Sequence, residues 1–146
     1  MSDFDRPLKG RGRKSAALIG ERLAKEKLKA VLLICSPAVR ARETAELVLK
    51  SAKLNVDQRF DDRIYEASLR DLLQVVAEIP NERPVVIMVG HNPGFEELLE
   101  FLTREYRRMP TAALAKVELD VESWDEVKAG EGRLELFVTP KELEEH

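Results

Sequence analysis

The stretch Val85-Val86-Ile87-Met88-Val89-Gly90-His91-Asn92-Pro93-Gly94-Phe95 decides the fold. Its first five residues are apolar, and proline and glycine bound the run, which predicts a strand buried on both faces. From Phe95 to Leu102, apolar residues recur at i, i+3, i+4 and i+7, the pattern of an amphipathic helix. We therefore expect His91 on a tight turn at the carboxyl end of a central strand, where open α/β sheets place their ligands.

A second junction of the same kind begins with the apolar run from Val31 to Cys35. The run leads into a helix predicted over residues 38–53, with Ser36 as its N-cap and Pro37 as its first residue. Arg40 lies in the first turn and adds a guanidinium that matches phosphate oxygens. Taken alone, His91 could simply cap its turn. Two such strand ends carrying an Arg and a His predict an anion site, with phosphate as the favoured ligand.

Further elements flank these two junctions. The patterns predict a polar lead-in over residues 1–9, followed by a helix that buries Ala16, Ile19, Gly20 and Leu23. Residues 55–63 are expected to form a connection with a short extended piece. Two further helices are predicted: one begins at Leu69, with Ser68 as its cap and Pro80 after its end, and the other runs from Phe95 to about Tyr106. Residues 113–121 and 133–138 alternate apolar with polar, which predicts two strands that pair antiparallel at an edge of the sheet. Residues 124–132 are expected to form a loop, and residues 142–146 a solvated tail in which His146 is a bystander.

Together these elements predict a single α/β domain over residues 1–146, a three-layer α/β/α fold with a mostly parallel sheet and antiparallel C-terminal edge strands. The parallel part looks thin, because only two strongly apolar strands accompany three or four helices. We therefore expect a central strand of the sheet to be missing.

Composition narrows the class of function and the compartment. The net charge of −3 favours neither nucleic acid nor an anionic membrane as a partner. A single cysteine excludes an internal disulfide framework and fits a reducing compartment. The apolar runs are too short to span a bilayer, and the first residues carry no apolar signal region, so a cytoplasmic location is expected.

At this point several motifs resemble one family. The segments Ser36-Pro37-Ala38-Val39-Arg40-Ala41-Arg42-Glu43-Thr44-Ala45 and Val89-Gly90-His91-Asn92-Pro93 resemble the second and third signature segments of the histidine phosphatase superfamily, specifically its small SixA-like phosphohistidine phosphatase branch. Further resemblances are Ser2 to Leu8, Gly10 to Arg13, Tyr65-Glu66-Ala67, Pro110 to Ala115 and Phe137 to Pro140. They occur in the family's order and extend over nearly the whole chain.

The resemblance implies a phosphoglycerate mutase-like fold and hydrolysis through a phosphohistidine intermediate, without metal or other cofactor. It assigns Arg40 as the Arg that clamps the phosphoryl group and His91 as the second His. Asn92 and Thr111 complete the expected phosphate-binding set, although Thr111 can also be an ordinary residue at the start of a strand.

Glu66 is the candidate proton donor, because related phosphatases often use an acidic residue in this region. Its alternative role is that of a carboxylate at a helix start that interacts with the dipole, Arg63 or Arg70.

The chain departs from the family pattern at its beginning. The family starts with a strand ending in Leu-Arg-His, whose His is the nucleophile, whereas this sequence has only His91 and His146, neither in an Arg-His pair. We therefore expect the nucleophile and its strand to be absent, through truncation of the reading frame or because the protein is a pseudo-phosphatase. Unpaired strand edges would then weaken the fold or be covered by a partner, and self-association is one way to cover them.

Cys35 is a poor substitute for that nucleophile. Cysteine phosphatases place five residues between Cys and Arg, and Arg40 comes one step too early for that loop. Cys35 is expected to be a small core residue.

Two classes of function remain open. The first is a phosphohistidine phosphatase that acts on a phosphohistidine domain of a phosphorylated protein or on a small phosphorylated molecule. The second is a non-catalytic module that binds the same phospho-ligands. A sugar-phosphate phosphatase is a remoter alternative, because the chain lacks the insertions that build a deep cap in larger relatives and its site is expected to be shallow.

Overall fold

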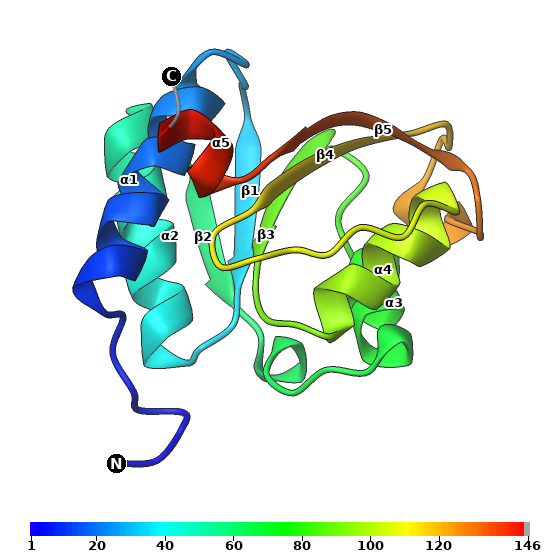
Figure 1. Ribbon diagram of the computed structural model, residues 1–146. Coiled ribbons are helices and arrows are strands. Elements are labelled where there is room, and N and C mark those ends of the chain that lie inside the picture. Colours follow the sequence, from blue (N-terminus) through cyan, green and yellow to red (C-terminus); the bar gives the residue numbers. More distant parts are fainter. Residues whose placement is uncertain (145–146) are drawn as a thin grey trace.

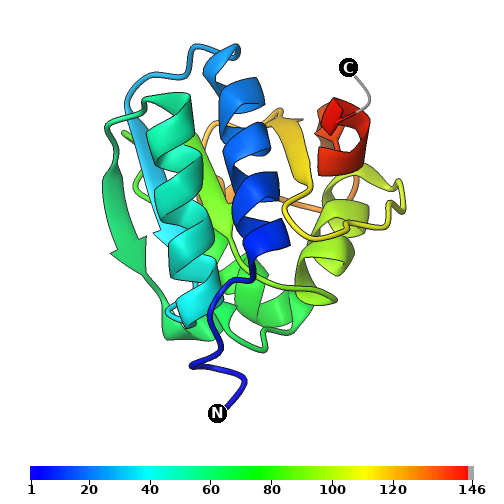
Figure 2. The same ribbon diagram turned by 60° about the vertical axis from the view of Figure 1, so that its left-hand side comes forward.

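The computed structural model, which describes residues 1–144, has a β layer between two pairs of helices (Figure 1). One face is covered by α1 (Gly10–Ala24) and α2 (Val39–Ala52), which lie side by side (Figure 2). The other face is covered by α3 (Leu69–Ala77) and α4 (Gly94–Thr103). The three-layer α/β/α arrangement predicted from the sequence is confirmed.

Three parallel strands form the main sheet. Their order is β2 (Asp57–Phe60), β1 (Val31–Cys35), β3 (Val85–Val89), and Cys35 pairs with Phe60 on one side and Val89 on the other. Every residue of β1 is buried, because this strand has a neighbour on each side. All three strands end at the same edge of the sheet, so the segments that follow them meet there.

The sequence predicts strand β2 only as a short extended piece. All four of its residues are exposed, so hydrophobic periodicity gives no sign of a strand. Its backbone pairing with β1 makes it the outer edge of the parallel sheet.

Strand β3 differs from its prediction as a central strand buried on both faces. It is an edge strand of the three-stranded sheet, and each of its residues is only partly buried. The physical reason is that, among residues 1–144, only β1 pairs with it.

Strands β4 (Leu114–Leu119) and β5 (Gly132–Val138) pair antiparallel, as predicted. Within the described part of the chain they form a two-stranded sheet of their own rather than extending the parallel one. The predicted loop between them contains the 3-10 turn η2 (Trp124–Glu126).

The tail from residue 142 begins within a helix that the sequence does not predict, although Glu142 and Glu144 are exposed as expected of a solvated tail. Residues Pro140–Glu144 form α5, and Leu143 packs against the cluster that contains Ile19 and Val48. His146 lies outside the described residues.

Two other helix ends test the sequence patterns. Ser68 caps α3 as predicted: its side chain accepts the N–H of Asp71, and the Asp71 carboxylate accepts the N–H of Ser68. Helix α4 ends at Thr103 rather than near Tyr106, because Arg104 adopts a left-handed backbone with φ of 62°.

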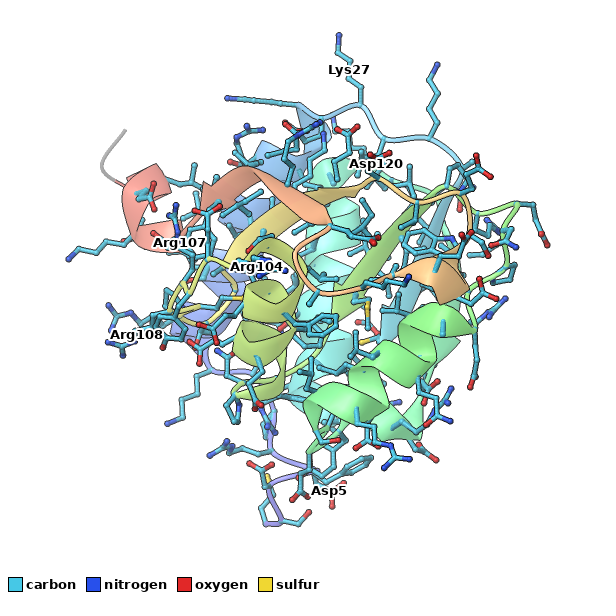
Figure 3. All side chains as sticks on the ribbon, turned by 90° about the vertical axis from the view of Figure 1, so that its right-hand side faces the viewer. Asp5, Lys27, Arg104, Arg107, Arg108 and Asp120 are labelled. Atoms are coloured by element: carbon cyan, nitrogen blue, oxygen red, sulfur yellow. The ribbon has the colours of Figure 1, made fainter. Side chains whose placement is uncertain are left out.

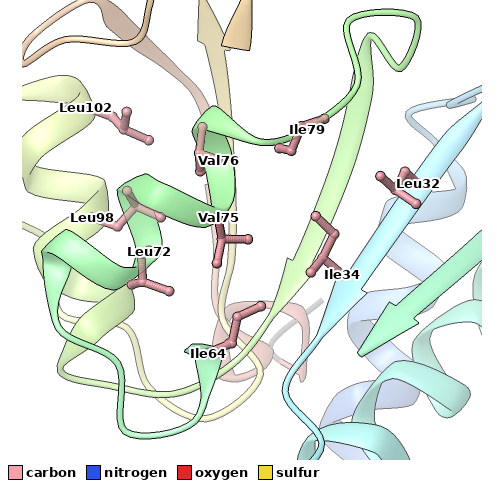
Figure 4. Close-up of a cluster of buried hydrophobic side chains, with 9 residues drawn as sticks. All are labelled: Leu32, Ile34, Ile64, Leu72, Val75, Val76, Ile79, Leu98 and Leu102. Carbon is pink, nitrogen blue, oxygen red and sulfur yellow. The ribbon is translucent and has the colours of Figure 1, made fainter. Parts of the chain in front are cut away.

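The largest apolar cluster lies between the sheet and the pair α3 and α4 (Figure 4). Its buried members are Leu32, Ile34, Ile64, Leu72, Val75, Val76, Ile79, Leu98 and Leu102. Ile64 belongs to the 3-10 turn η1 (Asp62–Ile64), so the cluster also anchors the segment that leads to Tyr65.

None of the helices within residues 1–144 combines the length and the hydropathy that a membrane-spanning helix requires.

We predict that Leu72→Ala destabilises the fold, because the Leu72 side chain is completely buried in this cluster. The loss should be about 2 to 5 kcal/mol in the free energy of unfolding, measured by urea denaturation. Phe60→Ala is the control, since Phe60 is 53% exposed and its loss should cost less than about 1 kcal/mol. Equal losses for the two variants would contradict the core described above.

Candidate functional site

Ser36 marks the point where β1 leaves the sheet. Its N–H donates to the carbonyl of Val89 at 2.9 Å, so the pairing of β1 with β3 continues through it. The prediction that Ser36 caps α2 and that Pro37 begins it is wrong, because the N-cap is Ala38 and the helix begins at Val39. The completely buried hydroxyl of Ser36 instead accepts the N–H of Ala38 at 3.2 Å.

His91 follows β3 on the turn that leads to α4. Gly90 is required there by close packing, since a Cβ at this position would lie 2.6 Å from the ring of Phe95 and 2.7 Å from Ile64. The carbonyl of His91 accepts the N–H of Phe95 at 3.1 Å, which ties the turn to the helix. The packing at Gly90 and this hydrogen bond fix the backbone that carries the imidazole at the carboxyl edge of the sheet.

Arg40 and His91 come from separate crossovers and meet at this edge. Nη2 of Arg40 lies 3.3 Å from Nδ1 of His91, although the two residues are 51 positions apart in the sequence. Nε2 of the same imidazole lies 2.8 Å from Oγ of Ser36. Both ring nitrogens of His91 thus have a polar partner, and the pair expected from the sequence lies together.

Asp3 and Tyr65 complete the cluster, and residue-based reasoning assigned neither of them a role. Arg40 donates from Nη1 to the carbonyl of Asp3 at 2.9 Å, and its Nη2 lies 3.2 Å from the Asp3 carboxylate. The hydroxyl of Tyr65 donates to the same carboxylate at 2.6 Å. The Tyr65 ring also meets His91 edge to face, with 5.5 Å between ring centroids. Both residues lie in segments that resemble the family, but residue type alone did not indicate this contact.

The charges of the cluster are set by these contacts. Burial, and then the cation of Arg40, lower the pKa of His91 below its ordinary value, while Asp3 acts in the opposite direction. The hydrogen bond from Tyr65, together with the charge of Arg40, holds the pKa of Asp3 below its usual range. That same bond raises the pKa of Tyr65. Near neutral pH the cluster therefore holds a neutral imidazole, a guanidinium and a carboxylate.

The other predicted site residues are not bonded to this pair. Asn92 donates from its amide to the carbonyl of Met109, so it ties the turn after β3 to the segment before β4. Glu66 is exposed, with a left-handed φ of 54°, and makes no hydrogen bond or ion pair with another residue of the range 1–144. Arg63, its expected alternative partner, binds Asp61 and Glu78 instead. Thr111 is exposed in the turn before β4 and contacts neither Arg40 nor His91 by a hydrogen bond.

Cys35 is a core residue. It is completely buried, and this burial raises the pKa of its thiol to about 12. A thiol that stays protonated and inaccessible is not a nucleophile.

The hollows at the far end of the β4–β5 pair do not suit an anion. Carboxylates line them, among them Asp120, Glu122 and Glu131. Within residues 1–144, no three His, Cys, Asp or Glu side chains are grouped so as to hold a metal ion. The cluster around Arg40 is therefore the candidate site, and a planar cation beside an imidazole fits an oxyanion.

The sequence matches a known protein family over more than half of its length. Residues 2–85 match the family described as histidine phosphatase superfamily (branch 1). An uncharacterised protein of Mycobacterium tuberculosis is 26% identical over 152 residues, which cover 97% of this chain and 93% of that protein.

Two solved structures are similar along nearly the whole chain. A structure of the protein histidine phosphatase SixA complexed with tungstate has a TM-score of 0.82 at 25% identity, covering 97% of this chain and 89% of that one. A candidate phosphohistidine phosphatase SixA from Nakamurella multipartitia has a TM-score of 0.85 at 24% identity, covering 96% and 88%. The second likeness concerns the fold alone.

We predict that Arg40→Gln raises the pKa of His91, because the neutral amide no longer repels the imidazolium form. The pKa should stay below the ordinary His value, since burial is the larger cause of the shift. An NMR titration of the imidazole signals measures it, with His146→Ala used to assign the two histidines. Arg42→Gln, on an exposed residue of the same helix, should leave the pKa unchanged. A pKa that falls in Arg40→Gln would refute this electrostatic picture.

Proposed function

This chain belongs to the histidine phosphatase superfamily (branch 1), and from that premise we propose that Arg40 and His91 bind the phosphoryl group of a phosphohistidine carried by a protein. The proposed activity is that of a phosphohistidine phosphatase, for which this chain supplies the groups that hold the phosphoryl group at the carboxyl ends of β1 and β3. Turnover also needs a nucleophilic histidine, and this sequence has no histidine in an Arg-His pair. Arg40 offsets the charge on the phosphoryl oxygens, and His91 donates to them in its protonated form.

The observation that carries the proposal is the convergence of Arg40 and His91, with 3.3 Å between Nη2 and Nδ1. Phosphoryl transfer depends mainly on positioning and on stabilisation of charge, which a guanidinium and an imidazole on two strand ends supply. The Asp3 carboxylate that lies 3.2 Å from Nη2 stands in for phosphoryl oxygens, and it supports the view that an oxyanion fits there. Tungstate, bound in the similar SixA structure, is also an oxyanion.

The surroundings of the site favour a protein substrate over a small sugar phosphate. Asn92 and Pro93 are exposed beside His91, so the described chain forms no cap over the pair. The segment bound to Asn92 carries Arg107 and Arg108, which are exposed and lie near Arg104 in Figure 3, apart from Asp120. This cationic flank suits the acidic surface of a phosphoprotein.

Glu66 stays a proposed proton donor for the leaving imidazole nitrogen. It follows Tyr65, whose ring contacts His91, so its backbone lies at the margin of the cluster. A leaving nitrogen needs a proton, although a phosphoramidate is labile enough to leave with little assistance. Asn92 is proposed to hold the His91 turn and Thr111 to line the opening.

A second candidate function is phosphoryl binding without turnover. It is favoured by one observation: His91 is the only histidine among residues 1–144, and it is held by Arg40 and Ser36 rather than free to attack. The two candidates share the same binding site and differ in whether a covalent intermediate forms.

We predict that Arg40→Ala weakens the binding of inorganic phosphate by about 10- to 100-fold, because a charge-assisted hydrogen bond is lost. His91→Ala should weaken it by several fold, and calorimetric or NMR titration gives the two dissociation constants. Arg42→Ala is the matched control and should bind as the parent does. Parent-like affinity in Arg40→Ala would end the proposal.

For turnover, we predict that the 146-residue chain forms no covalent phosphoenzyme with phosphoramidate as donor. Intact-mass spectrometry under neutral to alkaline conditions, which preserve phosphohistidine, detects the added phosphoryl group. A phosphohistidine on the chain would contradict the prediction and assign the chain to the catalytic candidate.

A further inference from the structure

The buried hydroxyl of Ser36 has no part in the proposed binding of phosphate, yet it touches the imidazole on which that binding depends. We propose that Ser36 is a positioning residue that keeps a proton on Nε2 of His91 and turns Nδ1 toward Arg40 and the bound oxyanion. The inference deepens the proposed function and rests on it only for the identity of the anion site.

The Ser36 side chain is a fixed point. Its main chain is held by the bond from Ser36 N–H to the carbonyl of Val89 at 2.9 Å, and Oγ accepts the N–H of Ala38 at 3.2 Å. No part of the residue is exposed to solvent. Because both the backbone N–H and the hydroxyl oxygen of Ser36 are hydrogen-bonded, this hydroxyl can orient the His91 ring, whose Nε2 lies 2.8 Å from Oγ.

The contact with Arg40 assigns the proton on His91. A guanidinium has only donors, so Nδ1, which lies 3.3 Å from Nη2 of Arg40, must offer its lone pair. In the neutral ring the proton is then on Nε2 and is donated to Oγ of Ser36. The opposite tautomer would set the Nδ1 proton against the N–H groups of Arg40.

A bound anion changes the protonation of Nδ1, whereas Nε2 keeps its proton. An oxyanion beside Arg40 brings negative charge to Nδ1, so the ring takes up a second proton there and donates it to the anion. The groups that face the ring are Arg40 from α2, which opposes protonation, Asp3 from the N-terminal segment, which favours it, and Tyr65 after η1. Anion affinity should therefore be highest below the pKa of His91 in the free protein, and this advantage is lost as the pH rises from that pKa through the higher pKa of His91 in the complex.

Removing the hydroxyl frees the ring from this constraint. In Ser36→Ala the neutral ring can carry its proton on Nδ1 and donate to the anion without proton uptake. The fall in affinity with rising pH should then become smaller, because the neutral ring can already donate to the anion. At low pH, where the ring is protonated in both proteins, the affinity should fall by about 3- to 10-fold, since the ring is no longer held.

The first test needs no anion. With histidine labelled by ¹⁵N and with His146→Ala in the background, NMR reports which nitrogen of His91 carries the proton at high pH. We expect Nε2–H alone in the parent and in Ser36→Thr, and a mixture of tautomers in Ser36→Ala. Ser15→Ala removes the other buried hydroxyl, on α1, and should behave as the parent. Nδ1–H in the parent would overturn the proposal even if Ser36→Ala did not fold.

The second test measures sulfate binding from about pH 5 to about pH 8, where sulfate itself does not titrate and the imidazole does. The parent and Ser36→Thr should bind more weakly as the pH rises, whereas Ser36→Ala should show a smaller decrease. The same pH dependence in Ser36→Ala and in the parent would refute the proposal. If the parent binds no sulfate, the proposed function fails, and the tautomer result still decides the role of Ser36.

Discussion

The parallel pairing of β1 with β3 is the constraint on which the site depends. It runs from Val31 with Val85 to Cys35 with Val89, and the bond from Ser36 to Val89 extends it by one residue. This register ends the two strands at the same level, so the first turn of α2 and the turn before α4 open toward each other. Arg40 and His91 meet because the backbone places them together, before any attraction between the side chains is considered.

Packing behind the sheet holds that register. The cluster around Leu72 presses α3 and α4 onto one face, and the cluster that contains Ala45 and Leu33 holds α2 on the other. The close approach of Phe95 and Ile64 at Gly90 connects the first of these clusters to the turn that carries His91. A change in core packing should therefore shift the position of the His91 imidazole, because His91 is the residue next to Gly90.

The N-terminal segment supplies the site with an anion of its own. Asp3 is bound by Arg40 and Tyr65. Under the proposed function, an incoming phosphoryl group would have to share or replace the contact between Asp3 and Arg40, so the net affinity would be the difference between two interactions with Arg40. Because Asp3 is half exposed, this competition takes place in a solvated setting and is modest.

The sequence by itself determined the elements with strong periodicity and the two strand-to-helix junctions that carry Arg40 and His91. Apolar runs and helical stripes are local consequences of burial, so they can be read without coordinates. Only the tertiary structure decided that β2 is an exposed edge strand, that β3 has a single partner among residues 1–144, and that Ser36 faces His91 rather than capping α2. It also placed Asp3 against Tyr65, 62 residues away in the chain. These features depend on contacts between distant segments, and no residue type or spacing encodes such a contact on its own.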